Sequence, residues 1–310
     1  MINKYLTEFG YSQDKISKII TNYELIRYKE NTLLIKIKII NEYLLTFLTI
    51  EQVIKLTTKF PQIYGYNLTT LKDKLNYLEN LGYSKDNLIK IILSLPNILA
   101  YSNKTIEETI NLFLNLGIKK QDILKITVKF PAVYSHRDLN KKINYLINLG
   151  FSLEEIPKMI VKFPQILSFH EDNILNTFNF LLSMQIPKVV VLKMLTISPQ
   201  IFGYNNLKIK ETIDIFKYYS YTYSDILLIL IKFPSILSKS KNSLISQLEF
   251  YKQENLEYLI IKNPRNLIQS ISLTRKRLEY LKYNNIPFNY QSLYLSNNEF
   301  NKRFIETKTK

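Results

Sequence analysis

The sequence predicts an all-α solenoid, a stack of similar helical repeats, and three observations support this. Proline recurs at nearly constant intervals: Pro61, Pro96, Pro131, Pro164, Pro199, Pro234 and Pro264 lie 35, 35, 33, 35, 35 and 30 residues apart. A residue suited to end a helix, often glycine, precedes most of these prolines by fourteen positions. The chain also lacks the long alternation of apolar and polar residues that predicts strands. Such a period is typical of solenoids, in which each repeat contacts only its neighbours.

Each repeat begins at a turn that ends the preceding helix. The turn residues are Gly82, Gly117 and Gly150, with Gln185, Ser220 and Asn255 in later repeats. A left-handed residue ends a helix there, and glycine adopts that conformation at the lowest cost. Two residues later stand the N-cap candidates Ser12, Thr49, Ser84, Ser152 and Thr222. Thr49 with Gln52, and Ser152 with Glu155, have the spacing of a capping box.

The first helix of a repeat follows this cap, and the proline ends it. Its apolar residues recur at helical spacing, as Leu88, Ile91, Ile92 and Leu95 do. Proline stops the helix because it lacks an amide hydrogen and restricts the residue before it. The second helix runs to the next turn, for example over 70–81. We expect the position five before the proline to be buried; it holds Ile91, Ile126, Met159, Met194 and Ile229.

The same register reaches both ends of the chain and predicts nine repeats in one continuous domain over residues 1–310. The proline positions are 24, 61, 96, 131, 164, 199, 234, 264 and 299, with Glu24 and Glu299 replacing proline in the end repeats. Atypical end repeats are expected because a terminal repeat faces water on one side. The repeat of Pro264 has lost about one helical turn, since Asn255 lies only nine residues before that proline.

The composition excludes several classes of function. The chain has no cysteine, which excludes disulfides, thiolate catalysis and cysteine-based zinc sites. The apolar run at 226–231 is six residues long, far below the roughly 18 of a membrane span. No phosphate-binding glycine loop, paired carboxylates or metal-ligand spacing appears, so we predict no catalytic site, cofactor or metal. The only histidines, His136 and His170, are interpreted as surface or junction residues.

Lysines recur at fixed positions of the repeat. The chain has 42 basic and 26 acidic residues and a net charge of +16, which is typical of a protein with a polyanionic partner. Six residues before the proline position stand Lys18, Lys55, Lys90, Lys125, Lys158 and Lys193, and two residues before it stand Lys59, Lys129, Lys162, Lys232 and Lys262. These positions are four apart and share a helix face. We predict that they bind nucleic-acid phosphates; the alternative is a solvated face whose lysines favour the helix dipole.

A second basic set lies eleven residues after the proline and comprises Lys72, Lys142, Lys210 and Arg275. Arg275, Lys276 and Arg277 form the densest basic cluster, and we include Arg275 and Arg277 in the predicted nucleic-acid site. Phenylalanine precedes four of the prolines, as Phe60, Phe130, Phe163 and Phe233. We expect these rings to pack at helix ends rather than to stack on bases.

The repeat resembles that of the mitochondrial transcription termination factor (mTERF) family. Residues 81–99 carry the pattern, from Leu81-Gly82-Tyr83-Ser84 to Pro96-Asn97-Ile98-Leu99. Residues 149–167 repeat it, from Leu149-Gly150-Phe151-Ser152 to Phe163-Pro164-Gln165-Ile166-Leu167, and so does the repeat of Pro234. The resemblance extends from Gly10 to about Glu299.

This resemblance implies a left-handed superhelix of helical triplets, each two α-helices and a short 3₁₀ turn, curved into a half-ring. It implies a basic concave face that holds double-stranded DNA or structured RNA, with the protein as a monomer. It also implies a non-catalytic role in transcription termination or initiation, RNA processing or ribosome assembly. The implied compartment is the mitochondrion, with the plastid as the alternative, and other organelle gene-expression proteins are expected partners. No membrane partner is expected.

Two features qualify these implications. The N-terminal segment carries Glu8 and Asp14, whereas organelle presequences are rich in arginine and poor in acids. The chain has six arginines against thirty-six lysines, so the cations suit phosphate contact better than the reading of base edges. The functional alternative is a protein-binding scaffold whose basic face docks an acidic partner or a ribosomal surface.

Overall fold

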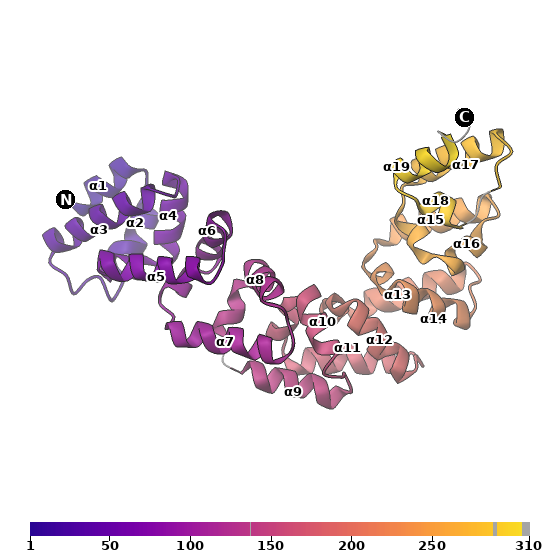
Figure 1. Ribbon diagram of the computed structural model, residues 1–310, viewed down its shortest axis with the longest axis horizontal. Coiled ribbons are helices and arrows are strands. Elements are labelled where there is room, and N and C mark those ends of the chain that lie inside the picture. The colour runs from indigo at the N-terminus through magenta and orange to yellow at the C-terminus, as the bar shows by residue number, and fades with distance from the viewer. Residues whose placement is uncertain (137, 288–289, 306–310) are drawn as a thin grey trace. The chain divides into compact units, whose positions relative to one another are not determined.

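The computed structural model describes residues 1–136, 138–287 and 290–305, and over these ranges the chain is helical without a strand (Figure 1). Nineteen α-helices, α1 to α19, are joined by turns and short 3₁₀ helices in this described part. The predicted all-α repeat architecture is therefore confirmed. The half-ring curvature implied by the resemblance stays a prediction.

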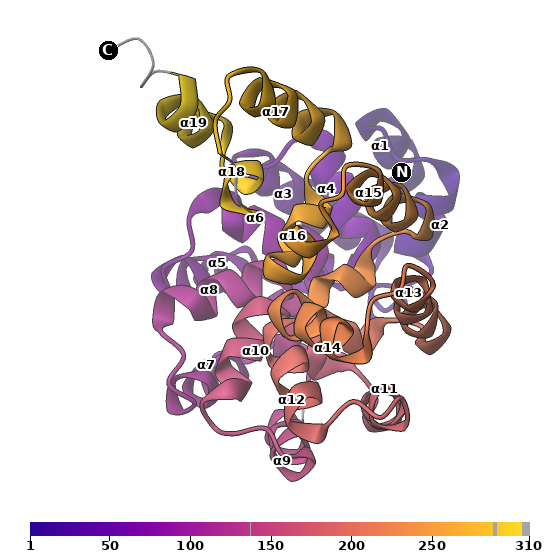
Figure 2. The ribbon, with the colours of Figure 1, turned by 90° about the vertical axis from the view of Figure 1, so that its right-hand side faces the viewer.

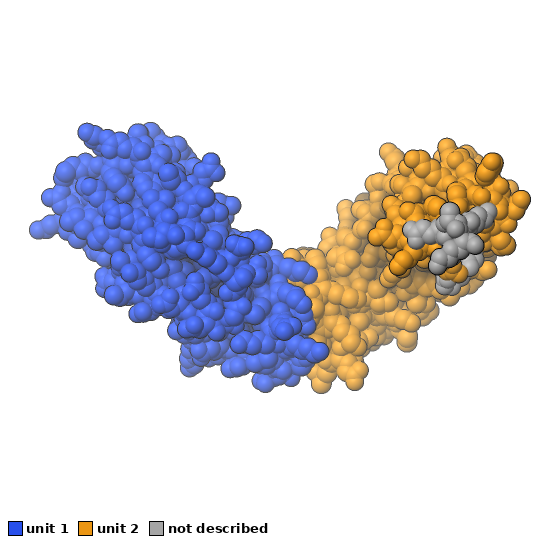
Figure 3. Space-filling view, turned by 45° about the horizontal axis from the view of Figure 1, so that its top comes forward, with its two compact units in different colours: residues 1–140 blue, residues 141–310 orange. Residues whose placement is uncertain are grey.

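The chain divides into two compact units, residues 1–140 (unit 1) and 141–310 (unit 2), which are coloured separately in Figure 3. Unit 1 contains α1 (Ile2–Phe9), α2 (Gln13–Ile20), α3 (Glu30–Leu45), α4 (Ile50–Lys59), α5 (Leu68–Asn80), α6 (Lys85–Ser94), α7 (Asn103–Asn115) and α8 (Lys120–Lys129). The boundary falls inside α9 (Leu139–Leu149). Unit 2 continues with α10 (Glu155–Lys162), α11 (Glu171–Ser183), α12 (Lys188–Ile197), α13 (Asn206–Tyr218), α14 (Tyr223–Lys232), α15 (Lys241–Gln253), α16 (Glu257–Lys262), α17 (Ile271–Tyr283), α18 (Tyr290–Tyr294) and α19 (Asn297–Phe300). That the repeats form a single domain stays a prediction.

Every repeat proline is the first residue of a 3₁₀ helix. The seven are η1 (Pro61–Gly65), η2 (Pro96–Leu99), η3 (Pro131–Ser135), η4 (Pro164–Ser168), η5 (Pro199–Gly203), η6 (Pro234–Ser238) and η7 (Pro264–Ile268). The α-helix before each proline ends two residues earlier, as α4 ends at Lys59 before Pro61. Proline fits the first helical position because no intrahelical bond needs its missing amide hydrogen. The predicted helix breaks are therefore confirmed.

The turns between repeats have the left-handed conformation that the sequence predicts. The φ angles are 107° at Gly10, 108° at Gly82, 78° at Gly117 and 115° at Gly150. The non-glycine residues in the same place are also left-handed, with φ of 64° at Gln185, 63° at Ser220, 57° at Asn255 and 50° at Asn285. This conformation costs a residue with a side chain more than it costs glycine, so the turn geometry is imposed by the repeat.

The capping predictions hold at most sites. Thr49 and Gln52 form the expected reciprocal capping box at α4. The Ser152 hydroxyl accepts from the Glu155 amide at 3.2 Å, and the Glu155 carboxylate accepts from the Ser152 amide at 2.9 Å. Ser12 is the exception, because its hydroxyl donates to the Asp14 carboxylate and makes no cap bond with α2.

Within each unit the helices form two layers. In unit 1, α2, α4, α6 and α8 pack successively on one another, and in unit 2, α10, α12, α14 and α16 do the same. We call these the even layers. The odd-numbered helices cover them; Figure 2 shows α11, α13 and α15 beside α12, α14 and α16. The five residues predicted to be buried, Ile91, Ile126, Met159, Met194 and Ile229, are at most 1% exposed. The shortened repeat is confirmed too, since α16 has six residues and α14 has ten.

Candidate nucleic-acid interface

The lysines six residues before the proline position are all exposed on even-layer helices. Unit 1 presents Lys18, Lys55, Lys90 and Lys125 from α2, α4, α6 and α8, and unit 2 presents Lys158 and Lys193 from α10 and α12. Successive even helices pack together, so within each unit these lysines stand at one register on adjoining helices. We call this set the lysine row.

The helix phase explains why the row is exposed. On α6, Leu88, Ile91 and Ile92 are buried, and the intervening Lys90 is exposed. An α-helix turns about 100° per residue, so a residue between two members of an apolar stripe points away from the core. The same phase recurs in each repeat because the proline and the turn set where every helix starts and stops.

Most ammonium groups of the row are not neutralised by a carboxylate. Lys125 forms an ion pair with Asp122, with a 2.9 Å Nζ–O distance, three residues apart on α8. Within the described part of the chain, Lys55, Lys90, Lys158 and Lys193 form no ion pair. Their charge is thus available to an external anion.

The row does not continue through α14 and α16. The equivalent residues there are Leu228, 42% exposed, and Tyr258, 47% exposed. The ammonium of Lys262 lies 5.4 Å from the centroid of the Tyr258 ring, within cation–π range. This end of the even layer therefore combines apolar and aromatic surface with the lysines that stand two residues before the prolines.

Those lysines, two residues before the prolines, are exposed, but three of them also join successive repeats. Lys59 Nζ donates to the Leu93 carbonyl at 3.5 Å, and Lys162 Nζ donates to the Ile197 carbonyl at 3.1 Å. Lys232 Nζ donates to the carbonyls of Ile261 at 3.0 Å and Lys262 at 3.2 Å. Each acceptor lies at the C-terminal end of the next even helix, where carbonyls lack intrahelical partners. An ammonium has three hydrogens, so each lysine can hold this carbonyl and still contact a phosphate.

Lys129 is exposed on α8 and keeps its place in the predicted site, as does Arg275 on α17. The guanidinium of Arg275 lies 5.6 Å from the centroid of the Phe250 ring. Arg275 stands on an odd-layer helix, however, and so belongs to a different surface from the lysine row. The other members of the second basic set, Lys72, Lys142 and Lys210, likewise lie on the odd helices α5, α9 and α13.

Arg277 must be removed from the predicted site. It is only 3% exposed, because α17 turns its Thr274, Arg277 and Leu278 inward. Its guanidinium donates to the Leu293 carbonyl at 2.8 Å and to Asn297 Oδ1 at 2.9 Å. Burial lowers the pKa of the guanidinium without neutralising it. Arg277 is therefore a structural link to the last helices.

Arg277 belongs to a buried polar position that the sequence analysis missed. Six of the seven residues that stand thirteen after the repeat prolines are buried, and Asn144, after Pro131, is exposed; the buried ones are Lys74, Thr109, Thr177, Thr212, Gln247 and Arg277. Several reach the backbone beyond the next 3₁₀ helix, as Lys74 Nζ does to the Tyr101 carbonyl at 2.6 Å and to Asn103 Oδ1 at 2.8 Å. Burial lowers the pKa of Lys74 to about 8. The repeated polar residue at this register was the signal that could have identified the position.

The histidines and the phenylalanines before the prolines take structural places. His170 Nδ1 accepts from the Asp172 amide at 3.4 Å at the start of α11, and the His136 ring stacks on Phe130 with centroids 5.8 Å apart. Phe60 is buried, and Phe130, Phe163 and Phe233 are half-buried. In the ranges that the structure covers, no three His, Asp or Glu side chains gather as a metal site, and no helix is long and apolar enough to span a bilayer.

Comparison with known proteins agrees with the repeat structure. The family model named mTERF matches residues 1–148 and 132–301, two overlapping segments that together run through nearly the whole chain. None of the curated proteins compared matches this chain. The matched segments contain the seven repeat prolines, the left-handed turns and the seven 3₁₀ helices that begin at those prolines. The chain belongs to the mTERF family.

Proposed function

We propose that this protein binds double-stranded DNA or structured RNA without catalysing a reaction, and regulates gene expression in an organelle. Membership of the mTERF family suggests a nucleic-acid-binding regulator of organelle gene expression. The observation that carries the proposal is the lysine row: one exposed lysine at the same register of six even-layer helices, in a chain of net charge +16. We propose the mitochondrion as the compartment, with the plastid as the alternative.

The row suits contact with phosphates rather than with bases. Lysine is a compact point charge without the planar fork with which arginine recognises guanine. Phosphate contacts set the position and orientation of a nucleic acid but carry no sequence information. We therefore propose that the row holds the backbone, and that any choice of target sequence comes from other residues or from the shape of the nucleic acid.

The test is the salt dependence of binding. The triple substitution of Lys18, Lys55 and Lys90 by Gln removes three exposed charges from α2, α4 and α6. Each lysine that neutralises a phosphate contributes about 0.9 to the slope of log affinity against log salt on duplex DNA. We expect the triple variant to flatten that slope by roughly two to three units, equally for unrelated sequences. The same titration with duplex RNA ranks the two kinds of target.

The matched control replaces three exposed lysines of odd-numbered helices, Lys38, Lys72 and Lys141, by Gln; like most of the lysine row, they form no ion pair with a described residue. This variant has the same net charge as the first but keeps the lysine row. Equal weakening by both triples would show that only total charge matters and would reject the row as the binding surface. No weakening by either would favour the scaffold alternative, in which the basic face docks an acidic protein or a ribosomal surface.

A further inference from the structure

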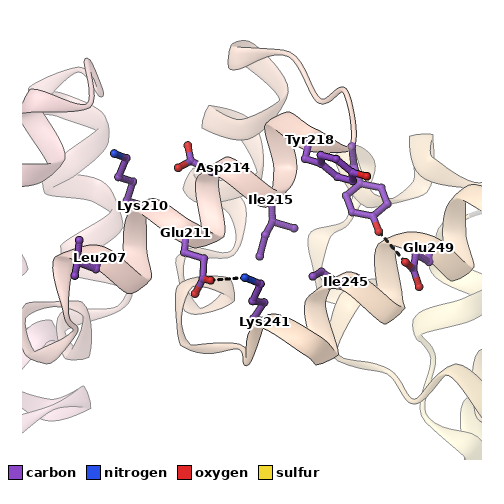
Figure 4. A pocket seen from close by; sticks show the side chains of 10 residues that line it. Leu207, Lys210, Glu211, Asp214, Ile215, Tyr218, Lys241, Ile245 and Glu249 are labelled. Carbon is purple, nitrogen blue, oxygen red and sulfur yellow. Dashed lines mark hydrogen bonds and ion pairs between the residues drawn. The ribbon is translucent and has the colours of Figure 1, made fainter.

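A groove lies between α13 and α15 in unit 2, on the odd layer. Figure 4 shows Leu207, Glu211, Ile215 and Tyr218 along α13, and Ile245 on α15 across the groove. The groove has a volume of about 690 Å³. The α13 residues follow one another at intervals of three or four, so they form one continuous stripe of the helix. The two helices thus form the walls of an open groove rather than an enclosed cavity.

Two exposed residues line this groove; Leu207 departs from the repeat, and Tyr218 is matched by a tyrosine in one other repeat. Leu207 is 73% exposed and Tyr218 is 83% exposed. The residues at the Leu207 register in the other 13-residue odd helices are Thr69, Lys104, Asp172, Asn242 and Ser272. At the Tyr218 register they are Asn80, Asn115, Ser183, Gln253 and Tyr283. The repeat fold therefore accepts polar residues at both places, and burial in this chain does not explain why α13 carries an exposed leucine and tyrosine.

The lining of the groove has one more acidic group than basic groups, in a chain that is strongly basic. Its lining holds three carboxylates, those of Glu211, Asp214 and Glu249, and two ammonium groups. Glu211 pairs with Lys241 at 2.8 Å and Asp214 pairs with Lys217 at 3.7 Å, while Glu249 accepts from the Tyr219 hydroxyl at 3.2 Å and forms no ion pair with any described residue. Glu249 is therefore the carboxylate of the lining that is left for a cationic side chain of a partner.

The groove and the basic residues of unit 2 lie on different layers. Lys193 on α12 and Lys232 on α14 belong to the even layer, and the groove belongs to the odd layer. A partner in the groove therefore does not need to displace a polyanion from those lysines. This separation is independent of whether the nucleic-acid proposal is correct.

We propose that the α13–α15 groove docks an amphipathic helix of a partner protein, with aliphatic side chains along the stripe and a lysine or arginine facing Glu249. Helix-in-groove binding uses anchors spaced three, four and seven residues apart, which matches the spacing of the α13 stripe. A second copy of this chain is a poorer occupant. The groove is not self-complementary in charge, so a second copy would have to bind head to tail, which forms rings or open filaments rather than a two-fold dimer.

The probe is a synthetic amphipathic peptide of about 18 residues, long enough to form helix in water. It carries leucine at positions i, i+4 and i+7 with one arginine between them, and a matched peptide carries glutamate in place of arginine. Binding to the full chain is followed by fluorescence anisotropy. We expect the arginine peptide to bind with a Kd on the order of 100 μM and the glutamate peptide at least about tenfold more weakly.

Two variants locate the site. Leu207→Thr with Tyr218→Asn installs residues that α5 carries at the same registers, Thr69 and Asn80, so the fold should be retained. We expect this double variant to weaken the arginine peptide at least about tenfold. Glu249→Lys should reverse the preference and favour the glutamate peptide. Tyr283→Gln changes an equally exposed tyrosine outside the groove and should leave peptide binding unchanged.

Several outcomes would overturn the proposal. They are no saturable binding of the arginine peptide at about 1 mM, equal affinity for both peptides, or binding that survives the double variant. A concentration-dependent rise in sedimentation mass that the double variant abolishes would assign the groove to a second copy instead. The slope of log affinity against log salt on duplex DNA should be unchanged in the double variant. A negative result with the peptides would therefore reject the groove proposal without affecting the nucleic-acid proposal.

Discussion

Two repeat junctions of unit 1 hold buried trios of Tyr, Thr and Tyr, on either side of a junction that is wholly aliphatic (Leu48, Ile92 and Leu99), whereas unit 2 has no complete trio and largely apolar side chains at the same registers. One trio joins Tyr11 Oη to Thr57 Oγ1 at 2.6 Å and to Tyr64 Oη at 2.9 Å, and Tyr64 donates onward to Asn41 at 2.8 Å. The other joins Tyr83 Oη to Thr127 Oγ1 at 2.5 Å and to Tyr134 Oη at 2.7 Å. Both trios use the residue after the turn, the residue four before the proline and the residue three after it.

In unit 2 these registers hold Phe151, Leu195 and Phe202 in one set, with the two phenylalanine rings 6.3 Å apart and edge to face. A second set, Ile186, Leu230 and Leu237, is wholly aliphatic and buried. The third is mixed, since Tyr221 stands with Ile260 and Leu267. Tyr221 is 8% exposed, and its hydroxyl has no hydrogen-bond partner in the described part of the chain.

The same three registers between repeats can thus hold either a hydrogen-bonded polar set or a wholly apolar set. A full trio satisfies its hydroxyls, and a fully apolar set has none to satisfy. The mixed set leaves a buried hydroxyl desolvated without a partner, which costs free energy. Four predictions test this difference between the units, from the largest effect to the smallest.

The largest effect should come from truncating the core in either unit. Ile91→Ala in unit 1 and Ile229→Ala in unit 2 each leave a cavity at a fully buried site and should cost about 2–5 kcal/mol of unfolding free energy. Repeats interact with their neighbours, so the loss of protection against amide hydrogen exchange should stay within the substituted unit. Ile35→Ala, at an exposed site of α3, is the control. If one substitution reduced protection against hydrogen exchange equally in both units, the two units would unfold together rather than separately.

Tyr83→Phe should destabilise unit 1 by about 1–3 kcal/mol, because it leaves the Tyr134 hydroxyl, 2% exposed, without its hydrogen-bond partner. Denaturant unfolding measures this loss. The further changes Thr127→Leu and Tyr134→Phe convert the trio to the composition of Phe151, Leu195 and Phe202, and should recover most of the stability. If the triple variant were less stable than Tyr83→Phe alone, the two chemistries would not be interchangeable.

A Tyr-to-Phe substitution at the same register should have the opposite effect on stability in unit 2. Tyr221→Phe removes the hydroxyl that has no partner and should raise the unfolding free energy by about 1 kcal/mol. Tyr218→Phe, at an exposed site, should change it by less than about 0.5 kcal/mol. A destabilised Tyr221→Phe variant would show that the hydroxyl is satisfied, for example by bound water, and that the mixed set carries no penalty.

The smallest effect at pH 7 is the pH dependence due to Lys74 in unit 1, which develops above about pH 8. Its folded pKa of about 8 lies below the ordinary value near 10.4, so the folded state binds fewer protons between these values. Stability should therefore rise with pH between about 8 and 10, by less than about 1.4 kcal/mol per pH unit, and Lys74→Met should flatten the rise. Above about pH 10 the slope should reverse, since burial raises the pKa of Tyr64 and Tyr83 and keeps them protonated only when folded. A fall in stability from pH 8 to 10 that Lys74→Met removes would contradict this account.

Much of the fold and part of the candidate site follow from the sequence. Local residues set where each helix begins and ends and which of its faces is apolar. The sequence could therefore predict the helix ends near Pro61 and Gly82, the burial of Ile91 and the exposure of Lys55 and Lys90. The inward turn of Arg277 could not be read from its basic neighbours Arg275 and Lys276, because a cluster of charges does not reveal which member faces the core. The polar residue that recurs thirteen after the prolines marks a register that is buried in six of the seven repeats, and Arg277 stands at this register.

By itself the sequence determined the helices, their order, their breaks and the register that places one lysine on each of six even-layer helices. Backbone chemistry explains this, since proline and left-handed residues end helices whatever surrounds them. Only the tertiary structure decided that Lys59 reaches Leu93, that Tyr221 lacks the partner that Tyr83 has, and that Leu207 and Tyr218 line a groove. These features join residues about one repeat apart or set two helices side by side. Their free energies therefore depend on packing between repeats, which spacing along the chain does not specify.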